Sequence, residues 1–485
     1  MSGSEPDGVP PPIEPVPTEP APAASRPFCR PWVTWLSTAL VVAIIGVLVH
    51  LSPGGPIDRL RWPEESLERL TEREMDARAA LARAAPLERR LYLLLAGDLS
   101  LDDWIRWYDE LARSTDSVQV DLEDFILLGE DRQTEALVEA VARWEPLGDE
   151  AARMKEWLAA AYLAPALDRS TARALITEVR DSLPAGWFAD VLVARIARRA
   201  DDAVSRAQAE SAMVARGTLL LRRWRALQAG GLLVVLGGLV GLAAMVGRRP
   251  DLRVAEARLP GDFSLLEGYG LFIRGALGFL VLGAVLGAMI PLDSGLDALT
   301  GPATAAPIVL ATLWYVRSRG LTLTGALGLR PAPDRLPQLV WVTITLVGLA
   351  LAGEGVASLV FDSLHLTSHW ADGLQENLIW GSWGVVARET VDSVLWAPLA
   401  EEIGFRGVFY PGLRTRMGVG AAAVVSAGVF ATAHGYGVTG FVAVFWSGIL
   451  WALARERTGS ILPGLAAHAL GNAGSTLGVI ALLRL

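Results

Sequence analysis

Residues 32–51 read WVTWLSTALVVAIIGVLVHL, an apolar run with no ionisable side chain before His50. At 1.5 Å per residue, a helix of this length crosses the ~30 Å hydrocarbon core of a bilayer. Only 20% of the 485 residues are charged and 52% are hydrophobic, a balance that favours a membrane protein. We therefore expect a transmembrane anchor at 32–51, retained as a span because no small-residue cleavage site stands out.

The chain on either side of this run is polar. Residues 1–25 are rich in Pro, Ala, Ser and acidic residues, which predicts a disordered tail. From 53 to 225, leucines such as Leu60, Leu67 and Leu70 recur at helical spacing among Glu and Arg, which predicts a soluble α-helical domain. We find no convincing tetratricopeptide-like repeat there. The segment has no His, no Cys and no Gly-rich phosphate loop, so we assign it no chemistry.

Residues 227–485 are predicted to form a helical membrane domain. Its spans are expected at about 227–246, 270–291, 301–316, 338–361, 387–410, 419–434, 440–454 and 461–483. Counting 32–51 as the first, arginines follow the even-numbered spans, whereas the loops 293–297 and 362–377 have none. The positive-inside rule then makes the N-terminal tail cytoplasmic and the domain 53–225 extracytoplasmic.

The predicted fold is thus an all-α polytopic membrane bundle with an N-terminal anchor helix and an outer helical domain, located in a bacterial plasma membrane. The net charge of −9 gives no indication of nucleic-acid binding. Cys29 is the only cysteine, so no intramolecular disulfide can form.

Polar groups inside hydrocarbon are costly, so they mark candidate functional sites. The sixth span contains APLAEEIGFRG at 397–407. Neighbouring residues of a helix point about 100° apart, so Glu401 and Glu402 cannot do the same job. Glu402 and Arg406 are i,i+4 neighbours and are predicted to form an ion pair, which leaves Glu401 free to face a cavity. Pro398 lacks an N–H and is expected to kink the helix before the glutamates.

Two further motifs lie in later spans. They read FATAH at 430–434 and HALGN at 468–472. His468 and Asn472 are also i,i+4 neighbours, so their donors can converge on one point. A carboxylate on one helix, a His on a second and a His/Asn pair on a third supply a general base and oxyanion-type donors.

At these residues the chain resembles the CPBP family, which includes type II CAAX prenyl endopeptidases and bacteriocin-processing or immunity proteases. The family pattern E-E-x-x-x-R, F-x-x-x-H and H-x-x-x-N/D occurs here in order, within a protease-like core at about 340–485. The resemblance implies an intramembrane endopeptidase in which Glu401 and His434 activate a water for attack on a peptide carbonyl. It further implies that His468 and Asn472 stabilise the oxyanion.

In this scheme Glu402 and Arg406 support the catalytic residues. The substrate is a peptide or protein in or at the bilayer, with or without a lipid modification. Because Glu401 precedes an arginine-bearing loop, we expect the site to open to the cytoplasmic half.

The resemblance leaves two versions of the chemistry open. In one, zinc is held by Glu401, His434 and His468, because two His and one Glu suit a tetrahedral zinc site. The other needs no metal or other cofactor, and we favour it because a carboxylate in a low-dielectric cavity is a stronger base.

Other interpretations assign these residues no catalytic role. The motif residues can form a polar network that only holds helices together, and the protein is then a non-catalytic membrane receptor or scaffold acting through residues 53–225. A transporter using Glu354 for proton coupling is a third hypothesis, but we see no internal repeat. Arg274 is interpreted as a packing or snorkelling residue. His365 and His369 are interpreted as residues of a solvated loop.

Overall fold

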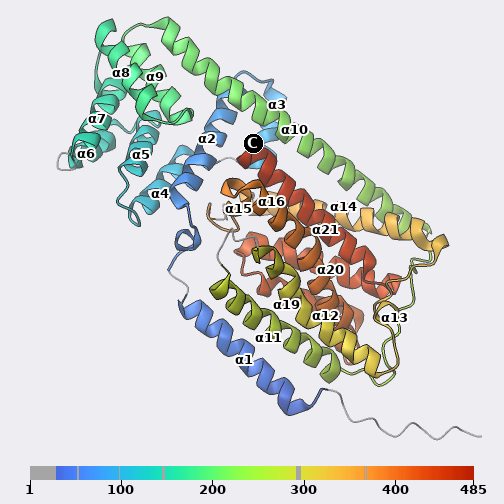
Figure 1. Cartoon of the computed structure of the whole chain (residues 1–485). Helices are drawn as coiled ribbons and strands as arrows, with labels where there is room; N and C mark the ends of the chain where they lie inside the picture. The colour runs from blue at the N-terminus through green and yellow to red at the C-terminus, as the bar shows by residue number, and fades with distance from the viewer. Residues whose placement is uncertain are drawn as a thin grey trace, which may run out of the picture.

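The structure is a computed structural model of the chain, and it describes residues 29–485 apart from 52–53, 98, 145–147, 249, 291–295, 365 and 367–368. In these ranges all regular elements are helical and no strand occurs. The predicted disordered tail at 1–25 lies outside the described residues. Figure 1 shows a bundle of long helices with a group of shorter helices at one end.

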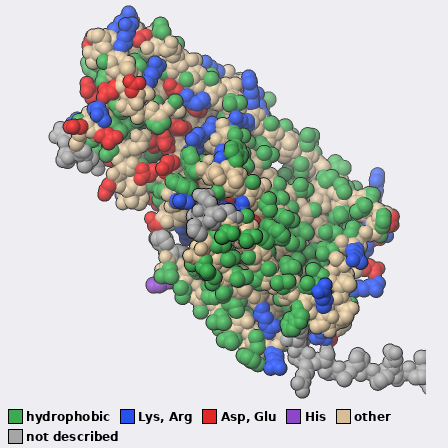
Figure 2. Space-filling model, in the orientation of Figure 1, with side chains coloured by type: hydrophobic (Ala, Val, Ile, Leu, Met, Phe, Trp, Pro, Cys, Tyr) green, Lys and Arg blue, Asp and Glu red, His purple; other side chains and the backbone are tan. Residues whose placement is uncertain are grey.

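Long apolar helices make up the bundle. They are α1 (Pro31–Leu51), α10 (Ala203–Arg248), α11 (Leu265–Met289), α12 (Thr300–Ser318), α14 (Leu336–Ser363), α19 (Val419–Ala433), α20 (Val438–Thr458) and α21 (Leu462–Val479). Within the described part of the chain, six helices are long and apolar enough to cross a bilayer. Hydrophobic side chains cover much of the bundle surface in Figure 2. The protein is therefore an all-α polytopic integral membrane protein, as predicted.

The predicted span 387–410 is an irregular helical path. It consists of α16 (Trp383–Val391), the π-helical η5 (Asp392–Trp396), α17 (Ala397–Glu402), the π-helical η6 (Ile403–Phe409) and α18 (Tyr410–Arg414). Pro398 lies at the start of α17, where its missing N–H interrupts the backbone ladder. The path widens into π turns on both sides of α17, a feature frequent at functional sites.

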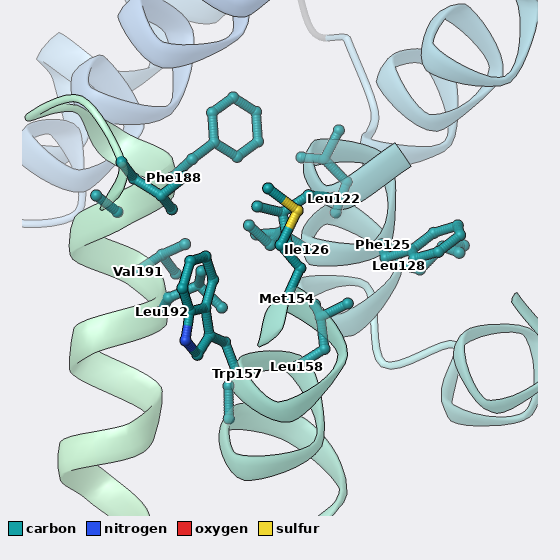
Figure 3. Close-up of a cluster of buried hydrophobic side chains, with 14 of the residues drawn as sticks. Leu122, Phe125, Ile126, Leu128, Met154, Trp157, Leu158, Phe188, Val191 and Leu192 are labelled. Carbon is teal, nitrogen blue, oxygen red and sulfur yellow. The ribbon is translucent and has the colours of Figure 1, made fainter. Parts of the chain in front are cut away.

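Eight helices, which we call the helical unit, form the group at one end of the bundle. They are α2 (Pro63–Leu81), α3 (Pro86–Ala96), α4 (Leu101–Ala112), α5 (Val118–Glu130), α6 (Thr134–Arg143), α7 (Asp149–Leu158), α8 (Arg169–Ser182) and α9 (Trp187–Arg199). Proline in the first turn starts α2 and α3, and a capping box at Ser100 starts α4. Their core includes the buried Leu122, Met154 and Trp157 of Figure 3.

Short helices complete the fold. They are η1 (Ile57–Arg59), η2 (Ala159–Leu163), η3 (Leu296–Leu299), α13 (Leu323–Leu327), η4 (Pro333–Arg335), α15 (Glu376–Trp380) and η7 (Ile480–Arg484).

Helix α10 belongs to both parts of the molecule. It runs without a break from Ala203 to Arg248, so the boundary predicted near 225 falls inside one helix. Arg216 of α10 pairs with Asp76 of α2 and Asp190 of α9, each at 2.7 Å. The helical unit is thus fixed to a helix that continues into the bundle, and the domain division at 225 stays a prediction.

The segment between α14 and α16, which includes α15, also holds the helical unit. The Glu376 carboxylate accepts hydrogen bonds from the backbone N–H groups of Arg61 and Trp62 at 2.7 and 2.9 Å. His369 contacts Glu110 at 3.1 Å, and Trp370 is buried in the core of the helical unit. We call this side of the bundle the unit end.

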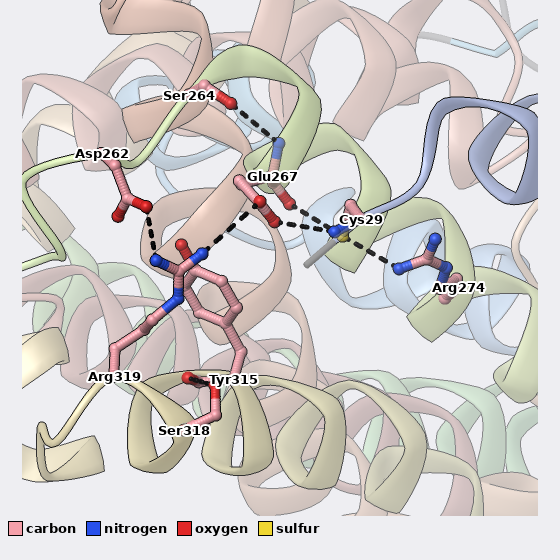
Figure 4. Close-up of polar contacts among 8 residues, drawn as sticks. All are labelled: Cys29, Asp262, Ser264, Glu267, Arg274, Tyr315, Ser318 and Arg319. Atoms are coloured by element: carbon pink, nitrogen blue, oxygen red, sulfur yellow. Dashed lines mark hydrogen bonds and ion pairs between the residues drawn. The ribbon is translucent and has the colours of Figure 1, made fainter. Parts of the chain in front are cut away.

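The opposite side, which we call the arginine end, gathers basic side chains, and Figure 2 shows them at the end of the bundle away from the helical unit. Here the backbone N–H of Cys29 donates to Glu267 of α11 at 3.1 Å, and Arg274 of α11 contacts the Cys29 Sγ at 2.9 Å (Figure 4). Arg319, just after α12, pairs with Asp262 in the same group. These contacts hold the start of the anchor helix α1 against the bundle.

Candidate active site

Glu401 points from α17 towards two imidazoles on other helices. Its Oε2 lies 3.6 Å from Nε2 of His468 in α21 and 4.0 Å from Nε2 of His434 at the end of α19. The side chain is 30% exposed, yet Oε2 is buried and has no hydrogen-bond partner among the described residues. A carboxylate oxygen without a partner is costly in a low-dielectric site, so this oxygen is available to a water or a substrate.

Glu402 turns away from Glu401 into the bundle. Its Oε1 accepts a hydrogen bond from Arg406 Nη1 at 3.0 Å, and both side chains are completely buried. Arg406 also donates to the carbonyl of Gly448 at 3.1 Å and lies 4.3 Å from the ring centre of Phe430. The ion pair expected from the i,i+4 spacing is therefore present, and it ties η6 to α19 and α20.

His434 is oriented by its own helix. Its Nδ1 lies 2.8 Å from the carbonyl oxygen of Phe430, the first residue of the F-x-x-x-H motif. A carbonyl can only accept, so this contact requires the proton on Nδ1 and leaves a lone pair on Nε2 of the neutral ring. That lone pair lies on the Glu401 side, so two acceptors border one space.

His468 lies between the two glutamates. Its Nε2 is 3.6 Å from Glu401 Oε2, and its Nδ1 is 3.5 Å from Glu402 Oε1. The ring is buried and stacks on Trp451, with centroids 4.4 Å apart and planes at 17°. Its Nδ1 has no hydrogen-bond partner among the described residues, so stacking on Trp451 is the contact that orients the ring.

Asn472 follows one turn after His468 on α21. Its Nδ2 donates to the carbonyl of Ser393 in η5 at 2.7 Å. This bond uses one of the two amide hydrogens and fixes α21 against the π-helical turn. The structure thus brings Glu401, His434 and His468 together, whereas Asn472 bonds to the backbone at the edge of the site.

A cavity of about 600 Å³ adjoins these residues. Glu401 and His434 line it, and its walls come from α11, α12, α16, η5, α17, η6 and α19. It includes Thr300 and Gly301, which begin α12 at the unit end. The cavity thus reaches the unit end, and the expectation that the site opens to the cytoplasmic half stays a prediction. The first turn of α12 borders this end of the cavity, where Gly301 lies against Asp392 of η5.

The zinc alternative needs three ligands that converge on one point. Among the described residues, no group of three or more His, Cys, Asp and Glu side chains is arranged to hold a metal. His468 lies between two carboxylates, with Nε2 on the Glu401 side and Nδ1 on the Glu402 side. The zinc alternative stays a prediction, and we derive no step through a metal.

The other polar residues weighed from the sequence lie elsewhere. Glu354 is exposed on α14, and Arg274 contacts Cys29 and Thr34 at the start of α1. His369 contacts the helical unit, as described above, so it is not a free loop residue. His365 lies outside the described residues.

The sequence reading missed the aromatic support of the site. Trp451 stacks on His468, and the ring of Phe430 lies between Arg406 and both histidines. Phe430 carried a signal as the first motif position, but nothing in the sequence singled out Trp451 of α20. The contribution of α11 and α12 to the cavity also had no sequence signal.

The fold and these contacts define a polytopic helical membrane protein with a carboxylate and two imidazoles inside its bundle. Residues 380–474 match the family described as type II CAAX prenyl endopeptidase Rce1-like. The match covers about a fifth of the 485 residues, includes all three motifs and confirms the resemblance to the CPBP family for this region. It supports a protease. No match was found among curated proteins or solved structures.

Proposed function

We propose that the protein is an intramembrane endopeptidase that hydrolyses a peptide bond with a water activated by Glu401 and His434. The observation that carries the proposal is the unpaired Oε2 of Glu401, which faces the His434 lone pair at 4.0 Å beside the cavity. Two acceptors at this separation can both receive hydrogen bonds of about 2.8 Å from one water.

The reaction starts when a peptide carbonyl lies next to this water. Glu401 takes a proton as the water oxygen attacks the carbonyl carbon, and His434 holds the water through Nε2. A protonated His468 donates to the developing oxyanion, where a preorganised donor lowers the barrier most. Glu401 then gives its proton to the leaving amide nitrogen, so that an acid and an amine are released.

The remaining motif residues support this chemistry. Glu402 and Arg406 hold α17 in place through their buried ion pair. Glu402 also orients His468 from the side opposite Glu401. We propose that the free hydrogen of the Asn472 amide adds a second oxyanion donor when substrate is bound.

The cavity and the loop charges together suggest how substrate arrives. The arginine end is the cytoplasmic side by the positive-inside rule, so the cavity extends towards the extracytoplasmic side of what we take to be a bacterial plasma membrane. A peptide or membrane-protein segment then enters beside the helical unit.

Peptide cleavage in phospholipid vesicles tests the proposal. Purified protein is incubated with a mixed peptide library, and the products are identified by mass spectrometry. Glu401→Gln and His434→Ala should each lower the cleavage rate by ~10²–10⁴-fold, because general-base catalysis contributes about this factor. Glu354→Gln is the matched control, since Glu354 is an exposed intramembrane glutamate outside the cavity.

Full cleavage by folded Glu401→Gln protein would refute the endopeptidase. Unchanged cellular phenotype with all four of Glu401, His434, His468 and Asn472 as alanine would favour the receptor or scaffold instead. Metal analysis of the purified protein, with and without chelator, decides between the two versions of the chemistry. Loss of cleavage with chelator and recovery with zinc would overturn the metal-free version.

A further inference from the structure

The cavity beside Glu401 has an apolar wall and an acidic end. Its wall includes Phe272, Phe279 and Ile308 of α11 and α12, whereas Glu389 and Asp392 lie where α16 passes into η5. Apolar walls suit a hydrophobic peptide segment, because burying such surface is favourable. The two carboxylates make one end of the cavity negatively charged, and an apolar segment has no group that pairs with this charge.

Glu389 already has cationic and polar partners. Its Oε1 accepts from Arg388 and from the Asn377 amide, each at 3.0 Å. Glu389 and Asp392 together carry two negative charges, whereas Arg388 supplies one positive charge. This end of the cavity therefore has a net negative charge.

The Oδ1 of Asp392 is buried and has no such hydrogen bond within the described part of the chain. On the facing helix, a Cβ at Gly301 would lie 1.9 Å from this oxygen, so only glycine leaves room for the carboxylate there. Oδ1 packs against Gly301, while the Asp392 side chain belongs to the cavity lining, where a charged carboxylate is costly unless a donor in the cavity reaches it.

We infer that this end of the cavity binds a lysine or arginine side chain of the substrate. The inference rests on the proposed function and specifies its substrate. Asp392 precedes Glu401 by nine positions, which is about 13 Å along a helix. An extended peptide covers that distance in about four residues. The substrate therefore carries its basic residue about four residues from the cleaved bond, with a hydrophobic stretch beside it.

Quenched fluorescent peptides with an apolar sequence test this in vesicles containing the protein. One Arg is placed at each position in turn, and the matched peptide carries Gln at the same position. At one position near four residues from the cut, Arg should raise kcat/KM about tenfold over Gln, because it pairs with a partly desolvated carboxylate.

Variants then assign the preference to the acidic end. Asp392→Asn should bring the Arg-to-Gln ratio near one, and Asp392→Lys should favour a Glu peptide at the same position. Asp362→Asn, an exposed aspartate at the unit end of α14, is the control and should keep the preference. Equal cleavage of Arg and Gln peptides at all positions overturns the inference but leaves the endopeptidase intact.

Binding provides a second measurement that does not need turnover. The Arg peptide should bind Glu401→Gln protein more tightly than the Gln peptide, as measured by fluorescence anisotropy. The double variant Glu401→Gln/Asp392→Asn should lose that difference. If wild-type protein cleaves no peptide, the endopeptidase proposal fails, and equal binding of the two peptides overturns the acidic subsite separately.

A second inference concerns α3, whose outer face is apolar. Leu87, Leu91, Leu94 and Leu95 share one side of this helix and are 44–69% exposed. On the opposite side, the Tyr92 ring lies 5.0 Å from Trp224 of α10. An exposed patch of four leucines is unusual on a water-facing surface.

The place of α3 along α10 identifies what covers this patch. Glu88 of α3 pairs with Arg225 of α10 at 3.1 Å, at the point where the charged part of α10 ends. Exposed leucines of the membrane-spanning part begin soon after, at Leu232. We infer that α3 lies in the membrane interface, with its leucines against lipid acyl chains, as amphipathic interfacial helices do.

A nitroxide label at Leu91→Cys tests this in phospholipid vesicles. The label should be accessible to oxygen and shielded from a water-soluble nickel chelate. A label at Val138→Cys, on the exposed face of α6, is the control and should show the reverse. Equal nickel accessibility at both positions overturns the inference. Shielding of position 91 from both reagents with spin–spin broadening would instead indicate a second copy of the chain.

Discussion

Buried carboxylates occur both in the helical unit and beside the cavity, but they differ in their hydrogen-bond and ion-pair partners. In the helical unit, Glu123 accepts from the Tyr108 hydroxyl at 2.9 Å, and Asp76 pairs with Arg216 at 2.7 Å. Beside the cavity, Glu402 pairs with Arg406, whereas the Oε2 of Glu401 has no hydrogen-bond partner among the described residues. Paired carboxylates hold helices together, whereas Glu401 and Asp392, which line the cavity, each keep an oxygen without a hydrogen bond among the described residues.

The helical unit shows what burial does to such groups. Burial, with Glu68 and Asp76 nearby, raises the pKa of Glu72 to about 7. Burial also raises the pKa of Glu123 well above its ordinary value. The Glu72 carboxyl is therefore sensitive to pH near neutrality, although no cavity or motif connects it with catalysis.

The largest loss of stability is expected for a substitution in the membrane bundle. Arg406→Met leaves the Glu402 carboxylate buried without its partner, which should lower stability by about 3–5 kcal/mol. Thermal unfolding in detergent measures the change. Arg414→Met is the control, because the Arg414–Glu456 pair is partly exposed and such pairs contribute about 0–1 kcal/mol. Equal shifts for the two variants would show that burial does not distinguish the pairs.

A core substitution in the helical unit should cost somewhat less. Leu158 is completely buried on α7, so Leu158→Ala is expected to destabilise the unit by about 2–5 kcal/mol through lost contacts and a cavity. Limited proteolysis of the helical unit in the intact protein reports the loss. Leu219→Ala, at an exposed leucine of α10, should change the cleavage pattern little. Similar proteolysis of both variants would contradict a packed core around Leu158.

The smallest effect concerns the pH dependence of the helical unit. Because the folded pKa of Glu72 is about 7 and its ordinary value is 4.5, the folded state binds the proton more tightly. The contribution of Glu72 to stability is then fullest below about pH 4.5 and is lost as the pH rises towards 7. Glu72→Gln mimics the protonated form, so it should stabilise the protein by roughly 1–3 kcal/mol at pH 8.

Unfolding of the helical unit at pH 5 and pH 8 measures this difference. The variant should lie closest to wild type at pH 5 and above it at pH 8. Glu156→Gln, at an exposed glutamate of α7, is the control and should follow wild type at both values. A Glu72→Gln variant that is less stable than wild type at pH 8 would sink the prediction.

The sequence predicted the membrane bundle closely because apolar length is a local property. The spans expected at 338–361 and 461–483 correspond to α14 and to α21 with η7. The path around Glu401 was predicted only as one kinked span, because the π turns of η5 and η6 depend on packing against other helices. The domain boundary near residue 225 was predicted from the change in composition. Composition does not show that α10 continues through this position as one helix.

The sequence predicted only those features of the candidate site that depend on a single helix. The Glu402–Arg406 pair follows from i,i+4 spacing, which a single helix determines. The part of the cavity bordered by the start of α12 was not predicted, since it depends on how α11 and α12 pack beside η5. Trp451 and Asp392 had no sequence signal, because their roles depend on helices that are distant in the chain.

By itself the sequence determined which segments are apolar enough for the membrane, which polar residues enter it and which of them share a helix face. These features follow from hydrophobic burial and the helical repeat, and both act over short stretches of chain. Only the tertiary structure decided that Glu401 meets His434 and His468, that Asn472 bonds to the backbone of η5 and that the cavity extends towards the helical unit. The physical reason is that contacts between helices depend on side-chain packing across the whole bundle.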